Sequence, residues 1–311
     1  MRPKTWLRAA LAVTITAAAG PPVFAQKAPS KKKSTTPWQD CGHGVSAHLS
    51  MPIAAQGVLL EVELLSAAPL AHLKADWDGH ELPFWQDSAG KNHQRALLGV
   101  DLEHESGNNN LELSAQLPAN ETFACSLNVR VNLGKFPVEK LTVEKKFVEP
   151  NPEEVARANH ERQHLKEIFA TVTPNRLWTG SFRLPLDGTR SAKNFGRRRV
   201  LNGVPGSLHS GVDFPALAGT PVHAAQRGRV VLAEGLFFSG NTVVIDHGLG
   251  VYTFYGHMRS TSAVPGDIVE KGSLLGEVGA TGRVTGPHLH WGLTVNQARV
   301  NPLQILSLPL S

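Results

Sequence analysis

The sequence predicts a mainly β protein in which one α-helix joins two β-rich regions. Only 18% of the residues are charged, and the 29 glycines and 21 prolines favour turns over long helices. Short runs of alternating polar and apolar residues occur both before and after a single stretch with helical character. A chain of 311 residues has room for about two domains, and its 41% hydrophobic content can supply their cores.

Residues 1–25 have the parts of a secretory signal peptide. Three basic residues among the first eight precede an apolar run at 9–19, and small residues near the end of the segment predict cleavage before Gln26. The apolar run is shorter than the roughly 20 residues that a membrane-spanning helix needs. We therefore expect an exported protein, periplasmic or secreted and associated with the cell wall, without a stable membrane span in its mature form.

Residues 26–37 are polar and rich in lysine, proline and serine, which predicts a disordered basic linker. Together with the signal peptide, this linker holds seven of the 31 Lys and Arg residues and no acidic ones. The rest of the chain therefore sets 24 basic residues against 26 acidic residues. Such a balance does not indicate a nucleic-acid partner.

Residues 38–149 are predicted to form an immunoglobulin-like β-sandwich. Runs such as 58–65, 110–117 and 125–133 alternate polar and apolar residues, and turn-forming stretches separate them. Several short strands at this spacing are typical of a sandwich of about 110 residues. The histidines of this region are scattered without the spacing of ligands, so we expect surface or turn roles for them.

The chain has two cysteines, Cys41 and Cys125, both within the predicted sandwich. In an exported protein an even pair predicts a disulfide bond. Because the bond would close a long loop, it would contribute about 4–5 kcal/mol in the chain-entropy model. The alternative is a pair of buried free thiols.

Residues 150–174 contain the one convincing helix. Asn151 can cap its start, and Pro152 suits the first helical position. Two glutamates follow at the positive end of the helix dipole, and Pro174 ends the pattern. A partial apolar stripe gives the helix one face to bury. We expect it to connect the two β-rich regions.

This helix carries His160-Glu161-Arg162-Gln163-His164, which spells the H-E-x-x-H motif of zinc metalloproteases. In that motif the two histidines bind zinc and the glutamate acts as base, but the metal needs a third protein ligand. The metzincin extension would place Gly at 167 and His at 170, where this chain has Glu and Ala. Because charged residues also surround the motif, we interpret it as part of a solvated connecting helix.

Residues 175–311 return to β patterning, and the segment HLHWGLTV (288–295) is the most informative part. On a strand, alternate side chains face opposite ways, so His288 and His290 share one face while the other face is fully apolar. Their Cα atoms would lie about 7 Å apart. Two imidazoles on an open face, backed by a core face, indicate a metal or proton-transfer site.

The segment LHSGVDF adds His209 and Asp213. On a straight strand these residues would lie about 13 Å apart, too far to share a metal ion, so the chain must bend between them. Gly211 permits such a bend. One carboxylate and two imidazoles, the second from either position 288 or position 290, would make a three-ligand set with an open fourth position, which is the catalytic arrangement for zinc. His257, after a Tyr-Gly pair, is a candidate imidazole for activating water.

The order of these motifs resembles that of the lysostaphin/LytM-type zinc endopeptidases. The H-x-x-x-D pair comes first, a lone histidine follows Tyr-Gly, and H-x-H lies inside GATGRVTGPHLHWG. The segments GTPVHAAQRGRVV, GNTVVIDHGLG and GDIVEKGSLLGEVG are also similar to that family's core. The resemblance runs over roughly residues 178–303, and the flanking stretches look like the two-domain exported bacterial members.

The resemblance implies a C-terminal domain with an antiparallel β fold of the duplicated hybrid type, spanning residues 175–311. It implies zinc bound by His209, Asp213 and His290. It also implies catalytic roles for His257 and His288. Some members use a tyrosine to support the oxyanion, but neither tyrosine of this chain lies at the expected place, so that role stays unassigned.

The function that follows is that of a zinc-dependent metalloendopeptidase that hydrolyses peptide bonds in peptidoglycan cross-links or stem peptides during cell-wall remodelling. The alternative is a non-enzymatic module that binds peptidoglycan or activates an amidase. We expect the N-terminal sandwich to position the enzyme, to bind a protein partner of the cell envelope or to occlude the cleft. The bond cleaved stays open among D,D-cross-links, L,D bonds and oligoglycine bridges.

Overall fold

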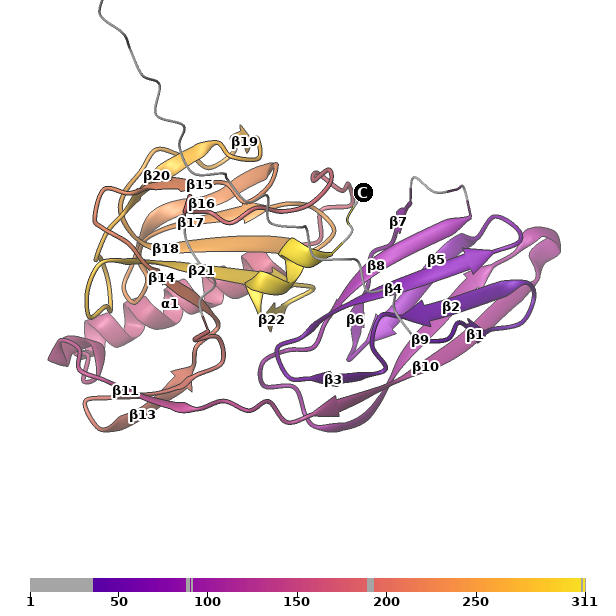
Figure 1. Cartoon of the computed structure of the whole chain (residues 1–311), viewed down its shortest axis with the longest axis horizontal. Coiled ribbons are helices and arrows are strands. Elements are labelled where there is room, and N and C mark those ends of the chain that lie inside the picture. Colours follow the sequence, from indigo (N-terminus) through magenta and orange to yellow (C-terminus); the bar gives the residue numbers. More distant parts are fainter. Residues whose placement is uncertain (1–35, 88–89, 91, 189–192, 309, 311) are drawn as a thin grey trace, which may run out of the picture. The chain divides into compact units, whose positions relative to one another are not determined.

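The computed structural model describes residues 36–87, 90, 92–188, 193–308 and 310 (Figure 1). The predicted signal peptide and all but the last two residues of the predicted linker lie outside this part of the chain. Within it, no helix combines the length and the apolar character needed to cross a membrane. The protein is mainly β, as predicted, and most of its strand pairs are antiparallel.

Two five-stranded sheets are built from residues 39–132. The first has the order β1 (Gln39–Asp40), β2 (Val45–Leu49), β4 (Leu59–Ser66), β8 (His93–Gly99) and β7 (Trp85–Gln86). The second has the order β3 (Ile53–Ala55), β10 (Thr122–Asn132), β9 (Gly107–Gln116), β5 (Ala71–Trp77) and β6 (His80–Glu81). Only the pair of β3 with β10 is parallel.

The two sheets share one hydrophobic core. In β10, buried and exposed residues alternate along all eleven positions, because one face of a sheet packs while the other meets solvent. Buried residues of the first sheet, such as Leu60 and Leu98, belong to the same cluster as Leu111 and Leu127 of the second. The sandwich is therefore confirmed as an arrangement of two packed sheets, and its immunoglobulin-like identity stays a prediction.

Cys41 and Cys125 form the predicted disulfide bond. Cys41 lies just after β1, and Cys125 is a buried residue of β10. The bond thus joins the edge of the first sheet to the second sheet of the sandwich.

A small three-stranded sheet follows the sandwich. It has the order β11 (Val138–Leu141), β12 (Arg198–Leu201) and β13 (Val204–Leu208), in which β11 and β12 are parallel. Of the short 3-10 segments, η1 (Pro118–Asn120) lies between β9 and β10 of the sandwich, and η2 (Lys145–Phe147) lies between β11 and the helix. Because β11 precedes the helix while β12 and β13 follow it, this sheet brings together segments about 60 residues apart.

The helix α1 spans Pro152–Ala170, inside the predicted range. Asn151 caps it through a capping box, because its side chain accepts from the Glu154 amide while the Glu154 side chain accepts from the Asn151 amide. The last turns carry Leu165, Ile168 and Phe169, which pack against a cluster of buried residues from the following sheet. One side of the helix is therefore packed, and the remainder faces solvent.

The largest sheet holds the remaining strands and is entirely antiparallel. Its main path is β14 (Gly211–Pro215), β21 (His288–Val295), β18 (Val251–Thr261), β17 (Gly240–Asp246), β16 (Gly228–Leu236) and β19 (Ile268–Val269). Three further strands join it, β15 (Pro221–His223), β20 (Leu274–Val278) and β22 (Ala298–Val300), and the 3-10 segment η3 (Pro302–Ser307) follows. Its core includes Val212, Leu289 and Trp291, the apolar faces of the strands that carry the predicted site.

Candidate metal centre

The pairing of β14, β21 and β18 gathers three predicted site residues at one point of the large sheet. Asp213 on β14 lies directly opposite His290 on β21, and His290 lies opposite Gly256 on its other side, in β18. Because directly opposite residues share a face of the sheet, Asp213 and His290 point the same way. His257 follows Gly256 in β18.

His209 reaches this point because the chain breaks between β13 and β14, as the sequence predicted. Residues 209 and 210 belong to neither strand, and the His209 amide donates to the Arg197 carbonyl oxygen. Gly211 is needed for space. A Cβ atom there would lie 2.5 Å from the Trp291 carbonyl oxygen and 2.7 Å from a carbon of the His290 ring. Glycine therefore lets β14 approach the site closely.

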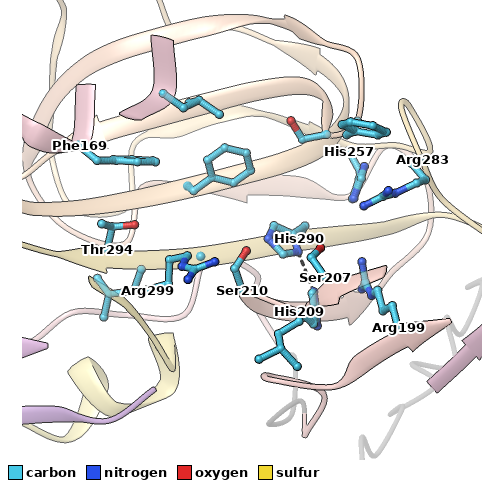
Figure 2. Close-up of a pocket in the computed structure, with 17 residues that line it drawn as sticks. Phe169, Arg199, Ser207, His209, Ser210, His257, Arg283, His290, Thr294 and Arg299 are labelled. Carbon is cyan, nitrogen blue, oxygen red and sulfur yellow. Dashed lines mark hydrogen bonds between the residues drawn. The ribbon is translucent and has the colours of Figure 1, made fainter. Parts of the chain in front are cut away.

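Three side-chain atoms converge at the site. His209 Nε2 lies 3.0 Å from Asp213 Oδ1, and His290 Nδ1 lies 2.8 Å from the same oxygen. The two ring nitrogens are 3.0 Å apart, along the dashed line in Figure 2. Atoms about 2 Å from a tetrahedral metal ion lie about 3.3 Å from one another. Opening the cluster by a few tenths of an ångström would therefore let these atoms hold a metal ion.

The surroundings orient two of these ligands. His209 Nδ1 donates to the Asn194 carbonyl oxygen at 2.9 Å, which leaves the lone pair of Nε2 directed into the site. The Asn194 side chain accepts from the Asp213 amide at 3.1 Å. The Arg199 guanidinium donates to Asp213 Oδ2, on the far side of the carboxylate from the histidines. The donor set, with an outer layer that fixes it, fits a divalent metal ion.

The site favours a neutral His290 beside an ionised Asp213 carboxylate. Burial alone would raise the pKa of Asp213, but its hydrogen bonds to His209 and His290 and their charges hold that pKa far below its ordinary value. Burial lowers the pKa of His290 to about 4, although Asp213 opposes the shift. Near neutral pH both ligand types are therefore in the protonation states that bind metals.

His257 is held by a β-bulge and a loop. Between the pairs Val243–Tyr255 and Asn241–Met258, β17 advances by two residues and β18 by three, so β18 carries an extra residue. His257 has a φ of 62°, and its Nδ1 donates to the Thr281 carbonyl oxygen at 2.8 Å. β18 continues past His257 to Thr261, and the bulge redirects the imidazole.

His288 and His257 form a pair next to the metal-ligand cluster. Their ring centroids are 4.8 Å apart, and His257 lies 5.9 Å from the His290 ring. His288 Nδ1 donates to the Gly286 carbonyl oxygen at 2.8 Å. Burial, with the charges of His290 and His288, lowers the pKa of His257 to about 3. With Nδ1 of each ring engaged, Nε2 is the atom of each that can accept or share a proton.

A cavity opens beside these histidines (Figure 2). Its apolar wall comes from α1, the β16–β17 turn and the sheet, and its polar wall holds three arginines. The lining of the cavity includes Phe169, Phe238, Arg199, Arg283, Arg299 and His257. A second cavity meets it at Arg199 and Arg283 and reaches Asp213 and His288. The two cavities thus form a cleft on both sides of the histidines.

The H-E-x-x-H motif lies elsewhere and is not assembled into a site. His160 and His164 are exposed on α1. Glu161 accepts hydrogen bonds from the Arg157 side chain and from the Phe237 amide, so its carboxylate ties the helix to the β16–β17 turn. Among the described residues, His209, Asp213 and His290 are the group of three with metal-ligand spacing.

The structure also shows what sequence reasoning missed. Asn194, Arg199 and Thr281 fix the site residues, and each reaches the site through tertiary pairing. Asn194 and Arg199 lie outside the quoted motifs, and Thr281 lies within GATGRVTGPHLHWG without a predicted role. Both tyrosines have other partners: the Tyr252 hydroxyl donates to the Thr171 carbonyl oxygen, and the buried Tyr255 hydroxyl accepts from the Ala225 amide. Neither supplies an oxyanion donor in this structure.

The His-Asp-His cluster lies in a part of the chain that is similar to known peptidases. Residues 207–302 match the sequence model of Peptidase family M23. This part of the chain is also similar to lysostaphin of Staphylococcus staphylolyticus, which is 36% identical over 106 residues, 33% of this chain and 22% of that protein.

The similar proteins act on cell-wall peptides according to their names. Peptidoglycan DD-endopeptidase ShyC of Vibrio cholerae is 42% identical over 122 residues, which are 39% of this chain and 28% of that protein. DD-carboxypeptidase/endopeptidase Mpg of Neisseria meningitidis is 39% identical over 127 residues, 40% of this chain and 29% of that protein. The chain thus matches less than a third of the length of these relatives.

One solved structure is similar over more of the chain. The crystal structure of an M23 peptidase from Pseudomonas aeruginosa aligns with 82% of this chain and 95% of its own, with a TM-score of 0.64 and 28% identity. That coverage is larger than the M23 domain, so the likeness extends to the preceding β-rich region.

Proposed function

We propose that this protein is a zinc-dependent endopeptidase that hydrolyses peptide bonds of bacterial peptidoglycan and remodels the cell wall. The observation that carries the proposal is the convergence of two imidazole nitrogens and one carboxylate oxygen within 3.0 Å, beside two further histidines. The similarity to named peptidoglycan endopeptidases supports the substrate class. We further propose export by the N-terminal signal, and a positioning or partner-binding role for the sandwich.

His209, Asp213 and His290 would hold the metal in this proposal. When bound, zinc supplies a Lewis acid that polarises the scissile carbonyl and makes water a better nucleophile near neutral pH. Three protein ligands leave a coordination position open, as in catalytic rather than structural zinc sites. Arg199 keeps Asp213 in place from behind and balances its charge.

His257 and His288 would move protons. Both rings donate through Nδ1 to backbone carbonyl oxygens, so Nε2 of each is left to face substrate and water. A neutral imidazole can take a proton from the attacking water, and the imidazolium that forms can stabilise the oxyanion or protonate the leaving amine. The low pKa of His257 keeps this residue neutral, and thus ready to accept a proton, at pH 7.

Digestion of purified peptidoglycan by the zinc-loaded chain tests the proposal. We expect new peptide termini, identified by mass spectrometry of the released muropeptides, which would also show whether a D,D, an L,D or an oligoglycine bond is cut. Treatment with a chelator should abolish the release, and added zinc should restore it. Metal-loaded protein that binds peptidoglycan but releases no termini would instead support the non-enzymatic wall-binding or amidase-activating module.

A further inference from the structure

Arg283 occupies a fixed position in the loop 279–287, which joins β20 to β21. Its amide donates to the Phe238 carbonyl oxygen at 2.8 Å. The preceding Gly282 has a φ of 75°, and a Cβ atom there would lie 2.4 Å from the Gly240 amide nitrogen. Because Thr281 of the same loop accepts from His257, the backbone that holds a catalytic histidine also holds Arg283 two residues on.

The Arg283 guanidinium lies in the cleft, where no carboxylate of the described residues pairs with it. It stacks on the Phe238 ring at 4.5 Å from the centroid, and it lines both cavities next to the histidines. Figure 2 shows the side chain extending toward His257. Among the described residues, no carboxylate forms an ion pair with it. Burial, followed by the charge of Arg199, lowers its pKa to about 10, so it still carries its charge at pH 7.

The other two arginines of the cleft differ in this respect. Arg299 binds Asp101 through two nitrogens and also pairs with Glu103. Arg199 pairs with Asp213. A partly buried guanidinium that lacks such a partner is costly to the folded protein, and a carboxylate bound in a fork would offset that cost.

The charge of the cleft around Arg283 is positive. The cavity beside His257 is lined by three arginines and, among the residues that the structure describes, by no carboxylate. The adjoining cavity contains Glu139 and Asp213, and both already pair with arginines: Glu139 with Arg197, just before β12, and Asp213 with Arg199 of β12. An anion entering the cleft would therefore meet an available guanidinium and no competing acid.

We propose that Arg283 binds a free carboxylate of the substrate peptide close to the scissile amide, and so selects cross-links whose diamino acid keeps its second carboxylate ionised. The inference rests on the proposed peptidoglycan substrate. Arginine suits this role because its planar fork matches a carboxylate in two hydrogen bonds, and Phe238 holds the plane of the fork. An amidated or decarboxylated diamino acid would leave the guanidinium unpaired, which a site of this kind rejects.

The test uses a matched pair of cross-linked peptide dimers that differ only in whether this carboxylate is free or amidated. We expect the zinc-loaded chain to cleave the free form with a kcat/KM at least about tenfold higher. Arg283→Gln should lose about tenfold or more on the free form, mainly through KM, and little on the amidated form. Arg283→Lys should recover part of the preference, because it restores the charge but not the fork.

The control is Arg229→Gln, since Arg229 is an exposed arginine of β16 whose side chain donates to the Gly266 carbonyl oxygen and does not line either cavity of the cleft. It should match the unchanged protein on both substrates. Zinc content and the thermal midpoint of each variant show whether the fold is kept. Equal losses of Arg283→Gln on both dimers, with fold and zinc intact, would overturn the proposal, because the residue would then act through its loop.

Binding separates this inference from the proposed function. The chain is titrated calorimetrically with two uncross-linked stem peptides, one with the carboxylate free and one with it amidated. Tighter binding of the free-carboxylate peptide should appear without any hydrolysis. A chain that binds selectively but cleaves neither dimer would contradict the proposed function and support the carboxylate site. A chain that cleaves both dimers equally and binds both peptides equally would support the function and contradict the site.

Discussion

The chain contains two pairs of histidines with the spacing of zinc ligands, and only the pair in the large sheet is assembled into a site. On α1, His160 and His164 lie one turn apart on an exposed face, and the intervening Glu161 is used to attach the helix. In the large sheet, His290 meets Asp213 from a paired strand and His209 from the bend before it. The difference is that a helix supplies two ligands by itself, whereas a sheet recruits the third from a neighbouring strand.

The comparison shows that a ligand motif needs a supporting layer as well as spacing. Two of the three proposed ligands in the sheet have partners outside the cluster that set their orientation: the Asn194 carbonyl oxygen for His209, and Arg199 for Asp213. In a solvated helix, side-chain rotamers are free, and ordering two of them costs entropy with no third ligand to offset the loss. The predictions below are ordered from the largest expected effect to the smallest.

Removing a ligand of the sheet motif should abolish both zinc binding and hydrolysis. For His290→Ala we expect zinc content near zero and peptidoglycan cleavage below detection, since two ligands rarely retain zinc. Metal analysis and muropeptide release are the measurements. The matched control, His160→Ala with His164→Ala, should keep full zinc stoichiometry and activity. Loss of zinc in that control, with retention in His209→Ala, would reverse the assignment of the two motifs.

Removing a histidine of the second pair should separate metal binding from catalysis. For His257→Ala or His288→Ala we expect kcat to fall by about 10² to 10⁴, the usual worth of a positioned proton-transfer group. Zinc content should stay at one ion per chain, because neither imidazole belongs to the ligand cluster. A variant that loses zinc together with activity would identify that histidine as a ligand.

A third kind of histidine, buried and structural, should control stability at acid pH. His247 is fully buried, its Nδ1 donates to the Arg227 carbonyl oxygen, and burial lowers its pKa to about 4. Because the unfolded chain protonates this residue at about pH 6.5, the free energy of unfolding should fall as pH drops from about 6.5 to about 4, by up to about 3 kcal/mol.

Urea denaturation in the presence of a chelator, at several pH values across that range, measures this effect. His247→Gln should be less stable at pH 7 but should lose less on acidification than the unchanged chain. The difference between the two pH profiles isolates His247 from the site histidines. Parallel profiles would contradict the prediction.

Weakening the support of a ligand should have a smaller effect than removing the ligand. Arg199→Gln removes the charged donor to Asp213 Oδ2, and we expect zinc affinity to fall by about 10- to 100-fold, as for other residues that orient metal ligands. Competition with a chromogenic chelator gives the affinity. Arg198→Gln, on the exposed face of the same strand, should leave it unchanged. An unchanged affinity in both variants would show that Asp213 is fixed without Arg199.

Much of this organisation could be read from local patterns in the sequence. Alternation predicted the strands, the period of two put His288 and His290 on one face, and the distance along a straight strand required the break after His209. The disulfide followed from the even cysteine count in a chain with a predicted export signal. These features depend on neighbours in sequence, or on composition, so a single chain can reveal them.

The rest could not be predicted because it depends on which strands pair. Nothing in the sequence around Asn194 or Arg199 indicates that they reach Asp213, since β12 arrives there through the small sheet it forms with β11 and β13. The bulge that turns His257 is visible only from the register of β17 against β18. Without the resemblance to known peptidases, the residue pattern alone left open which histidine of the H-x-H pair binds the metal.

The loop 279–287 has a consequence for redesign and for natural variation. It carries Thr281, which aims His257, and Arg283, and its Gly282 is pressed against the backbone of Gly240. An insertion or deletion here would shift His257 at the same time as Arg283. With the roles proposed above, exchanging the Arg283 side chain would alter substrate preference without moving His257, whereas a change in loop length would disturb both.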